Sequence, residues 1–522
     1  MSSTFRQALM VAACAALAAP AVQAQDREPA AGFARVIVGF KAGAEPGARA
    51  AVVAARGRIA RELPSVAAAA VELPSAAVAA LSRNPNVEYV EEDAKRYPLA
   101  LTAPSATPYA SGQLEPWGIR AVQAHLLPLG DSLTANRKVC IIDSGYSLGH
   151  GDLPGSSRVS GYSVVSLPWD KDGDGHGTHV AGTIAALNNA GTGVVGVNSG
   201  NNLNLYIVRV FGDSGAWAYS STLVDAATRC QSGGANVISM SLGGSVSSRA
   251  EQTKFQQLLD ANILPIAAAG NGGNSRTSYP AGYASVVSVA AVDVNNAKAD
   301  FSQYNKDVEI SGPGVGVLST VPNGKGLLGS LNVADLVVEA FPFEGSPQFS
   351  RSGPLFNFGI GDAVNAGASG KVCLIARGTV DFSTKVSNCQ ASGGVGAVIY
   401  NNAAGAFSGT LGTTVTTIPS VSISQEDGNS LQSRIDAATT VGVNAANYAY
   451  YDGTSMATPH VSAVAALVWS YFPSSCSATQ LRNSLNKSAK DLGAVGRDSS
   501  FGFGLVQAQA AYDRIVLRGC GN

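Results

Sequence analysis

The stretch KVCIIDSG, residues 138–145, decides how the rest of the sequence is interpreted. Four apolar residues in a row are followed by Asp143, and then by a serine and a glycine. An uninterrupted apolar run of this length is typical of a strand buried on both faces of a parallel sheet. A carboxylate at the end of such a strand is held in place and can accept the Nδ1–H of an imidazole. Taken alone, an acid in this position is more often a simple turn residue.

Strands and helices alternate along the chain after this stretch. Apolar strands separated by helices indicate a three-layer α/β fold with a mostly parallel sheet covered on both faces. Ligands of such sheets bind at the carboxyl ends of the strands, and the Gly-rich polar motifs of this chain lie there. Strands are predicted at residues 205–211, 236–241, 263–269 and 285–292, and helices at 220–232, at 249–262 and from about residue 176.

A histidine motif, DGHGTHVAGT, covers residues 174–183. Gly175 and Gly177 leave space around His176 for the close approach of other groups. His176 and His179 are one helical turn apart, a spacing that zinc ligands can have. No glutamate lies between them, which argues against the zinc-protease motif and leaves a metal pair as the weaker interpretation.

A serine motif, DGTSMATPH, covers residues 452–460 and opens an apolar helix predicted from Met456 to Phe472. A serine at the start of a helix exposes its hydroxyl, and backbone N–H groups point toward the reacting atoms. The alternative is that Thr454 or Ser455 only caps the helix.

The order Asp143, His176, Ser455, with these surroundings, resembles the subtilisin family of serine proteases. Chymotrypsin-like and α/β-hydrolase enzymes place the same three roles in other orders. Two more stretches resemble family motifs: SLGG at 241–244, which resembles the strand that pairs with substrate backbone, and AAAGN at 267–271, which resembles the oxyanion-hole segment. The resemblance covers residues 113–322 and 447–515, and it implies a subtilisin-like fold.

The resemblance also implies a serine endopeptidase that works by acyl transfer. Ser455 would attack the peptide carbonyl, and His176, oriented by Asp143, would move the proton. The oxyanion would be held by the Asn271 side chain and the Ser455 backbone N–H. The alternative from another class is an inactive scaffold that binds proteins; the presence of all the motif residues argues against it. An aminopeptidase or tripeptidyl protease is the other enzyme considered, and no feature that would anchor a free amine is visible.

Two substrate pockets follow from the same resemblance. The residues that line the first pocket are small and apolar and include no acid. This predicts substrates with a large apolar or aromatic residue before the scissile bond. Ser278 aligns with the floor of this pocket, and Tyr219 borders a second apolar pocket. The remaining residues expected to contact substrate are Ser241, Leu242, Gly243, Gly244, Ala268 and Gly270.

The N-terminal part has the features of an exported precursor. Arg6, the apolar run 8–22 and the small residues at positions 22 and 24 predict a signal peptide at 1–24, cleaved after Ala24. The run is shorter than the roughly 20 residues that span a bilayer, so a membrane anchor is the weaker interpretation. Strands at 35–40, 66–73 and 87–93 with helices at 46–56 and 75–82 form a small α/β unit.

This unit resembles the inhibitory propeptide of subtilisins, which implies that the chain's own propeptide is an intramolecular inhibitor. We expect a propeptide at 25–110 with its core at 33–93, and a catalytic domain at 111–522. The stretch 95–113 is expected to be an exposed linker, with the mature start between residues 97 and 111. A permanent accessory domain is the alternative.

Calcium is predicted at two places. Gln113, Asp152, Leu187 and Asn189 match a calcium site of subtilisins, although the loop after Asn189 is one residue longer than in the family. The second place is the acidic loop with Asp170, Asp172 and Asp174, which resembles the start of an EF-hand loop but lacks its distal glutamate. A solvated loop is the alternative there. No organic cofactor is expected.

An insert separates the oxyanion segment from the serine motif. The stretches GKVCLIARG (370–378) and GVGAVIYNN (394–402) resemble a protease-associated (PA) domain, expected at 323–446 and rich in β-structure. Its position in the sequence suggests a place beside the cleft, where it would gate substrates. A stabilising or dimerising surface is the alternative.

The cysteines and the charge complete the picture. Of 7 cysteines, Cys14 lies in the predicted signal peptide, and the even remainder in an exported chain suggests disulfides. Sequence allows 15 pairings of six cysteines; we expect Cys140–Cys230, Cys373–Cys389 and Cys476–Cys520, with free buried thiols as the alternative. The net charge of −1 gives no sign of nucleic-acid binding. We therefore expect a secreted monomer that acts on proteins or peptides and has no membrane span.

Overall fold

The computed structural model describes most of the chain. No helix in the described part is long and apolar enough to cross a membrane. The predicted signal peptide lies outside the described residues. These are 28–98, 106–108, 113–127, 137–189, 193–403, 407, 409–412 and 414–522.

The central unit, residues 113–322 and 447–522, is built on a seven-stranded sheet. Every strand pair in it is parallel, so the predicted α/β fold is confirmed. The strand order is β16 (Ile310–Pro313), β15 (Val287–Val292), β14 (Leu264–Ala268), β12 (Val237–Met240), β8 (Lys138–Asp143), β10 (Asn204–Arg209) and β9 (Val159–Ser163).

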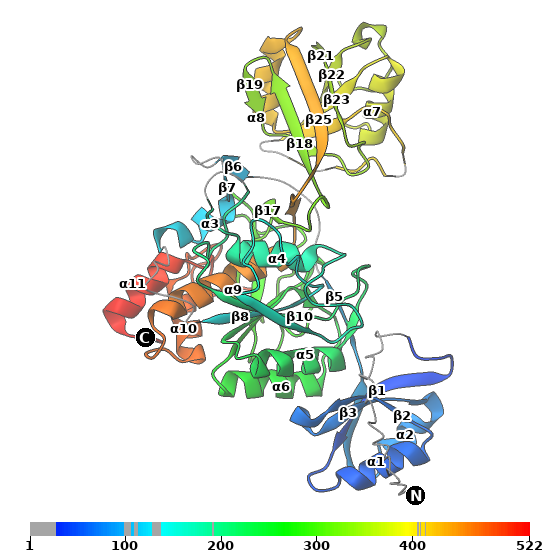
Figure 1. The fold of residues 1–522 in the computed structure, drawn as a ribbon, viewed down its shortest axis with the longest axis vertical. Helices are drawn as coiled ribbons and strands as arrows, with labels where there is room; N and C mark the ends of the chain where they lie inside the picture. The colour runs from blue at the N-terminus through cyan, green and yellow to red at the C-terminus, as the bar shows by residue number, and fades with distance from the viewer. Residues whose placement is uncertain are drawn as a thin grey trace, which may run out of the picture.

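Helices cover both faces of this sheet, with α4 on one side and α5 and α6 on the other (Figure 1). Successive side chains of β8 point to opposite faces, as in any strand. Val139 and Ile141 pack in the core with α4 and α9, whereas Cys140 and Ile142 pack with α5 and α6. This explains the unbroken apolar run. The helices are α3 (Trp117–Ala121), α4 (His176–Ala185), α5 (Ser220–Ser232), α6 (Arg249–Asp260), α9 (Thr454–Tyr471), α10 (Ala478–Ser488) and α11 (Ala508–Arg518).

The N-terminal unit, residues 33–93, is a four-stranded antiparallel sheet with two helices. The strand β2 was not predicted, because its sequence RIAREL does not alternate regularly between polar and apolar residues, and it lies at the edge of the sheet. The order is β2 (Arg58–Leu63), β3 (Ala68–Pro74), β1 (Phe33–Phe40) and β4 (Val87–Glu92), with helices α1 (Glu45–Ala54) and α2 (Val78–Leu81).

The insert, residues 323–446, folds around an eight-stranded mixed sheet. In Figure 1 it stands at the opposite end of the molecule from the N-terminal unit. A short antiparallel pair, β17 (Val317–Thr320) and β26 (Tyr448–Tyr451), closes the point where it leaves the central unit. The insert's elements are β18 (Gly326–Val333), β19 (Leu336–Val338), β20 (Phe341–Pro342), β21 (Ser350–Asn357), β22 (Val372–Ala376), α7 (Phe382–Ala391), β23 (Gly396–Tyr400), β24 (Ser420–Ile423), α8 (Gln425–Leu431) and β25 (Ala438–Ala446).

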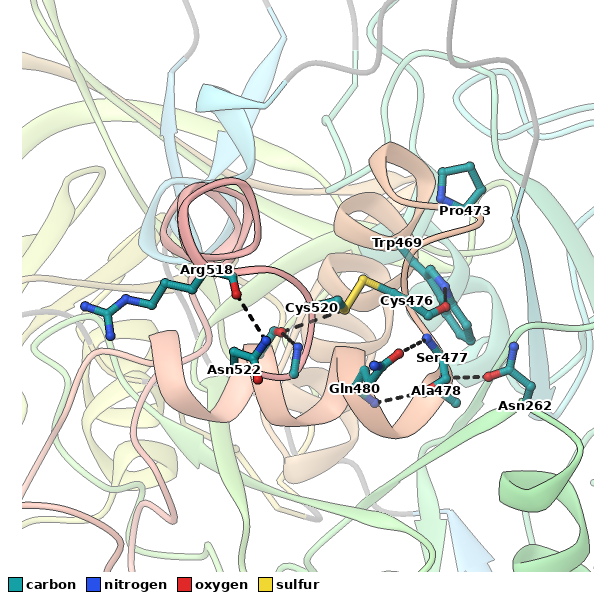
Figure 2. The surroundings of a disulfide bond; sticks show 12 residues. Asn262, Trp469, Pro473, Cys476, Ser477, Ala478, Gln480, Arg518, Cys520 and Asn522 are labelled. Atoms are coloured by element: carbon teal, nitrogen blue, oxygen red, sulfur yellow. Dashed lines mark hydrogen bonds between the residues drawn. A yellow bond between two sulfur atoms is a disulfide. The ribbon is translucent and has the colours of Figure 1, made fainter.

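Within the described residues, disulfides join the three expected pairs, Cys140–Cys230, Cys373–Cys389 and Cys476–Cys520. Figure 2 shows the last of them, which ties the chain after α11 to the loop before α10. Two hydrogen bonds hold that loop from the other side: the Trp469 indole donates to the Cys476 carbonyl at 3.0 Å, and the Ala478 N–H donates to Asn262 Oδ1 at 2.6 Å. The C-terminus is therefore fixed to the core.

Candidate active site

Asp143 and His176 meet at the carboxyl end of β8. The Nδ1 of His176 lies 2.7 Å from Asp143 Oδ1, and both side chains are buried. The close packing of the start of α4 against the end of β8 needs a glycine at position 177, because a Cβ there would lie 2.4 Å from the Gly145 carbonyl oxygen. Burial alone would lower the pKa of His176, but the Asp143 carboxylate outweighs this and raises that pKa above its usual 6.5. His176 Nε2 has no hydrogen-bond partner among the described residues.

The second histidine of the motif has a structural role. His179 Nε2 lies 3.0 Å from two backbone carbonyl oxygens, those of Val317 and Ala449. The ring also stacks on Tyr451. Burial lowers the pKa of His179 to about 3, so the ring stays neutral. The two histidines therefore do not form a metal pair.

The acidic loop before His176 is held in place by hydrogen bonds to its carboxylates. Asp172 accepts four of them: Ser144 Oγ and Gly175 N–H reach Oδ1, and Thr178 N–H and Oγ reach Oδ2. The carboxylate thereby anchors the start of α4. Asp174 accepts the His176 N–H, at 3.1 Å. Calcium at Asp170, Asp172 and Asp174 stays a prediction.

Ser455 lies in the first turn of α9. Its hydroxyl donates to the Ser241 carbonyl at 3.1 Å, and Ser241 Oγ donates back to the Ser455 carbonyl at 2.7 Å. The hydroxyl thus bonds to Ser241, and no hydrogen bond between Ser455 and His176 is formed among the described residues. N–H groups in a first helical turn lack intrahelical acceptors, which leaves the Ser455 N–H available to an oxyanion.

The Asn271 amide is oriented by Thr454. Its Oδ1 accepts the Thr454 N–H at 2.9 Å and the Thr454 hydroxyl at 2.7 Å. Because a backbone N–H can only donate, the amide oxygen must face Thr454. The Nδ2 donor then lies on the other side, as an oxyanion donor must.

The predicted first pocket is brought together by backbone contacts. Gly244 exchanges two hydrogen bonds with Tyr279, of 2.9 and 2.8 Å, which joins segment 241–244 to the segment of Ser278. Gly270 has φ +111°, and a Cβ on it would lie 3.3 Å from the Ser278 Cβ. Gly270 and Ser278 therefore face each other.

The predicted linker forms a strand in the cleft. Residues Lys95–Pro98 make β5, which lies between β11 (Ala218–Tyr219) and β13 (Leu242–Gly243) as the middle strand of an antiparallel sheet. The expectation of an exposed linker is wrong over these residues. Their composition suggested a loop, because their partners are supplied only by distant parts of the chain.

A buried ion pair joins β5 to the central unit. Arg96 of β5 meets Glu251 of α6, and neither side chain is exposed. Glu251 was not among the predicted site residues, because a single glutamate in a polar helix carries no signal of burial. The second apolar pocket beside Tyr219 stays a prediction.

Two carboxylates next to β5 cap helices of the central unit. Asp93 accepts the Ser221 N–H at the start of α5, at 2.8 Å. Glu91 accepts the Arg249 and Ala250 N–H groups at the start of α6, at 2.7 and 3.0 Å. Negative groups at helix N-termini satisfy free N–H donors and the helix dipole.

The other four predicted calcium ligands come together. Gln113 Nε2 donates to the Leu187 carbonyl at 2.9 Å and to Asn189 Oδ1 at 3.1 Å, while Asn189 Nδ2 donates to Asp152 Oδ1 at 3.1 Å. Gln113 Oε1 is buried without a partner among the described residues. Turning this amide over would bring Oε1 toward the other oxygens, and an oxygen set suits calcium. Residues 190–192 of the longer loop after Asn189 lie outside the described part.

Three family profiles match the chain. One described as the subtilase family matches residues 134–331, one described as the PA domain matches residues 343–431, and one described as the fervidolysin N-terminal prodomain matches residues 19–93.

Similar proteins are found among curated sequences. Alkaline elastase YaB of Bacillus sp. (strain YaB) is 39% identical over 255 residues, which are 48% of this chain and 61% of that protein. Subtilisin E of Bacillus subtilis (strain 168) is 37% identical over 272 residues, which are 51% of this chain and 67% of that protein. The chain thus spans about three fifths to two thirds of these relatives' length.

Solved structures agree with this result. The psychrophilic subtilisin-like protease Apa1 from the Antarctic psychrotroph Pseudoalteromonas sp. AS-11 has a TM-score of 0.67 and 40% identity, covering 78% of this chain and 100% of that one. Fervidolysin from Fervidobacterium pennivorans has a TM-score of 0.59 at 22% identity over 92% of this chain and 61% of that one, a likeness of fold alone. The chain therefore belongs to the subtilase family of serine endopeptidases, with a PA domain and a fervidolysin-like N-terminal prodomain in addition.

Proposed function

We propose that this chain is a secreted serine endopeptidase made as a precursor, with Ser455, His176 and Asp143 as its catalytic residues. One observation carries the proposal. β5 of the same chain lies antiparallel to β13, as a bound peptide would, and the carbonyl of Ser241, the residue before β13, accepts the Ser455 hydroxyl.

In the reaction, the Ser455 oxygen attacks the peptide carbonyl carbon and its proton passes to His176 Nε2. The C–N bond then breaks, and the same proton moves to the leaving amine. Water hydrolyses the acyl-enzyme by the reverse sequence of proton transfers. Asp143 stabilises the imidazolium that forms in each half. Asn271 Nδ2 and the Ser455 N–H hold the oxyanion.

The prosegment, residues 25–110 after a signal peptide at 1–24, inhibits the enzyme in this proposal. Its strand β5 excludes substrate, and Glu91 and Asp93 attach it to two helices. The enzyme cuts its own prosegment within residues 97–111 and leaves a catalytic domain that contains the insert. A first pocket lined by small, apolar residues around Gly270 and Ser278 suits large apolar or aromatic side chains before the cut.

Calcium is the metal that we propose for the cluster of Gln113, Asp152, Leu187 and Asn189. Bound there, it would fix the loop between α4 and β10 and leave the chemistry to the protein's own residues. A chelator should then lower the melting temperature of the mature enzyme. An unchanged melting temperature after complete chelation would contradict this assignment.

The intact mass of the secreted wild type and of Ser455→Ala, each with and without a fluorophosphonate, tests the proposed function. We expect only the wild type to lose its prosegment and gain the label. If wild type fails to label after the prosegment has been removed by another protease, the chain is not a serine peptidase. An inactive scaffold that binds proteins would then replace the proposal.

A further inference from the structure

The Arg96 side chain enters the central unit instead of turning to solvent. Its Nη2 donates to Glu251 Oε2 at 2.5 Å, and both side chains are 0% exposed. The Tyr283 hydroxyl donates to the same carboxylate oxygen at 2.9 Å. Glu251 therefore lies at the end of a pocket that a guanidinium of the cleft strand fills.

The pocket itself belongs to the central unit and stays when the prosegment leaves. Glu251, Tyr283 and Gly244 all lie outside the prosegment, and a Cβ on Gly244 would lie 3.0 Å from Arg96 Nη1. Among the described residues, Arg96 is the only ion-pair partner of Glu251. Burial raises the pKa of Glu251, and Arg96 opposes that rise. A buried carboxylate without a cation is unfavourable, so the vacated pocket favours a new one.

The strand register tells which substrate residue would enter this pocket. Tyr97 pairs with Gly243 and Pro98 pairs with Leu242. One step further along β13 stands Ser241, whose carbonyl accepts the Ser455 hydroxyl. A peptide bound in this register would present one residue at Ser455 and, three positions earlier, the residue that takes the place of Arg96.

We propose that Glu251 makes the mature enzyme select arginine at the fourth residue before the scissile bond. The inference rests on the proposed function. It adds a specificity-determining carboxylate to a cleft whose first pocket suits apolar side chains, so the preferred substrates combine an arginine with an apolar residue three positions later. Lysine, which is a compact charge without the planar fork of arginine, should be accepted less well.

Two fluorogenic peptides that differ only in arginine or citrulline at this position give the test. Citrulline keeps the shape of arginine and lacks its charge. We expect kcat/KM of the wild type to be about 10- to 100-fold higher for the arginine peptide, the range for a charge-assisted hydrogen bond. Glu251→Gln should bring the ratio close to one, because kcat/KM of the arginine peptide falls much more than that of the citrulline peptide. Asp260→Asn, on the exposed end of the same helix, is the matched control and should keep the ratio.

In a precursor with Glu251→Gln alone, Arg96 is buried without its carboxylate partner, which disfavours folding. The double variant Arg96→Met/Glu251→Gln removes this unpaired charge and allows the same ratio of the two peptides to be measured. Equal cleavage of both peptides by the wild type would overturn the inference, whether or not either variant folds. A ratio that survives in Glu251→Gln would overturn the role of Glu251. If the wild type cleaves neither peptide and also fails to take up a fluorophosphonate, the proposed function itself is wrong.

Discussion

The N-terminal unit and the insert are both added to the same central unit, but they are attached in different ways. The N-terminal unit shares a core with the central unit: Ile37, Leu63 and Ala68 pack with Val224 of α5 and Ala250 of α6. Arg61 also pairs with Asp225 at 2.8 Å. The two main cores of the insert contain residues of the insert alone.

The insert reaches the central unit through a few residues of its N-terminal part. Lys325 donates to the Gly173 carbonyl at 2.9 Å, next to the loop before His176, and the Phe341 ring meets that of Tyr450. The rest of the insert extends away (Figure 1). The N-terminal unit, which is removed in the proposed function, is bound through residues of the substrate-binding region. The insert, which stays attached, is stabilised by its own core. The predictions below test this contrast.

The largest effect is expected from Asp143→Asn. The amide cannot stabilise the His176 imidazolium, so kcat should fall by about 10⁴-fold, and the prosegment should stay covalently attached. In the wild type, kcat/KM should rise with pH through an inflection above 6.5, because Asp143 raises the pKa of His176 and only the neutral ring accepts a proton. Kinetics of the mature variant, with its prosegment removed in trans, should show a lower inflection. An unchanged pH profile would contradict this role for Asp143.

The insert's own disulfide should matter next. Cys373 and Cys389 are 16 residues apart, and loss of such a cross-link costs about 3 kcal/mol on the chain-entropy scale. Cys373→Ser/Cys389→Ser should therefore lower the unfolding temperature of the insert and leave cleavage of a short peptide unchanged. Calorimetry and peptide assays of the same sample measure both. A parallel loss of peptidase activity would show that the insert is not energetically separate.

The helix-capping carboxylates should contribute less. Asp93→Ala or Glu91→Ala should weaken binding of the prosegment by about 1 kcal/mol each, the usual cost of replacing a capping residue by alanine. Inhibition of the mature enzyme by added prosegment measures this. Glu88→Ala is the control, because Glu88 and Arg249 form an exposed pair, 44% and 54% accessible, and such pairs contribute little. Equal effects of all three variants would contradict the capping argument.

Deletion of residues 323–446 should have the smallest effect on a short peptide. If the insert gates the cleft, a large protein substrate should be cleaved at a changed rate while the short peptide is not. Equal effects on both substrates would contradict gating and favour a stabilising role for the insert.

Much of the fold could be predicted because its signals are local. The apolar run of β8 has to be buried on both faces, so it indicated the parallel sheet before any contact was known. The residues around Asp143, His176, Asn271 and Ser455 were found from short motifs, since strand ends and a helix start hold them. Cys373 and Cys389 were close enough in sequence to be paired by proximity.

Other features depended on distant residues and left no local signal. The edge strand β2 and the cleft strand β5 resemble loops in composition, and only their partners make them strands. The hydrogen bonds of Asp172 could not be predicted, because the donors from Ser144 and Thr178 become its neighbours only when β8 and α4 pack together.

The sequence by itself determined the sheet, the order of the candidate catalytic residues and the family, because these depend on runs and motifs within a few residues. Only the tertiary structure decided that Lys95–Pro98 lies in the cleft and that Arg96 meets Glu251, 155 residues away. The physical reason is that the burial of the Arg96–Glu251 pair depends on contacts between distant segments of the chain. The residues next to Arg96 and Glu251 in the sequence contain no signal for these contacts.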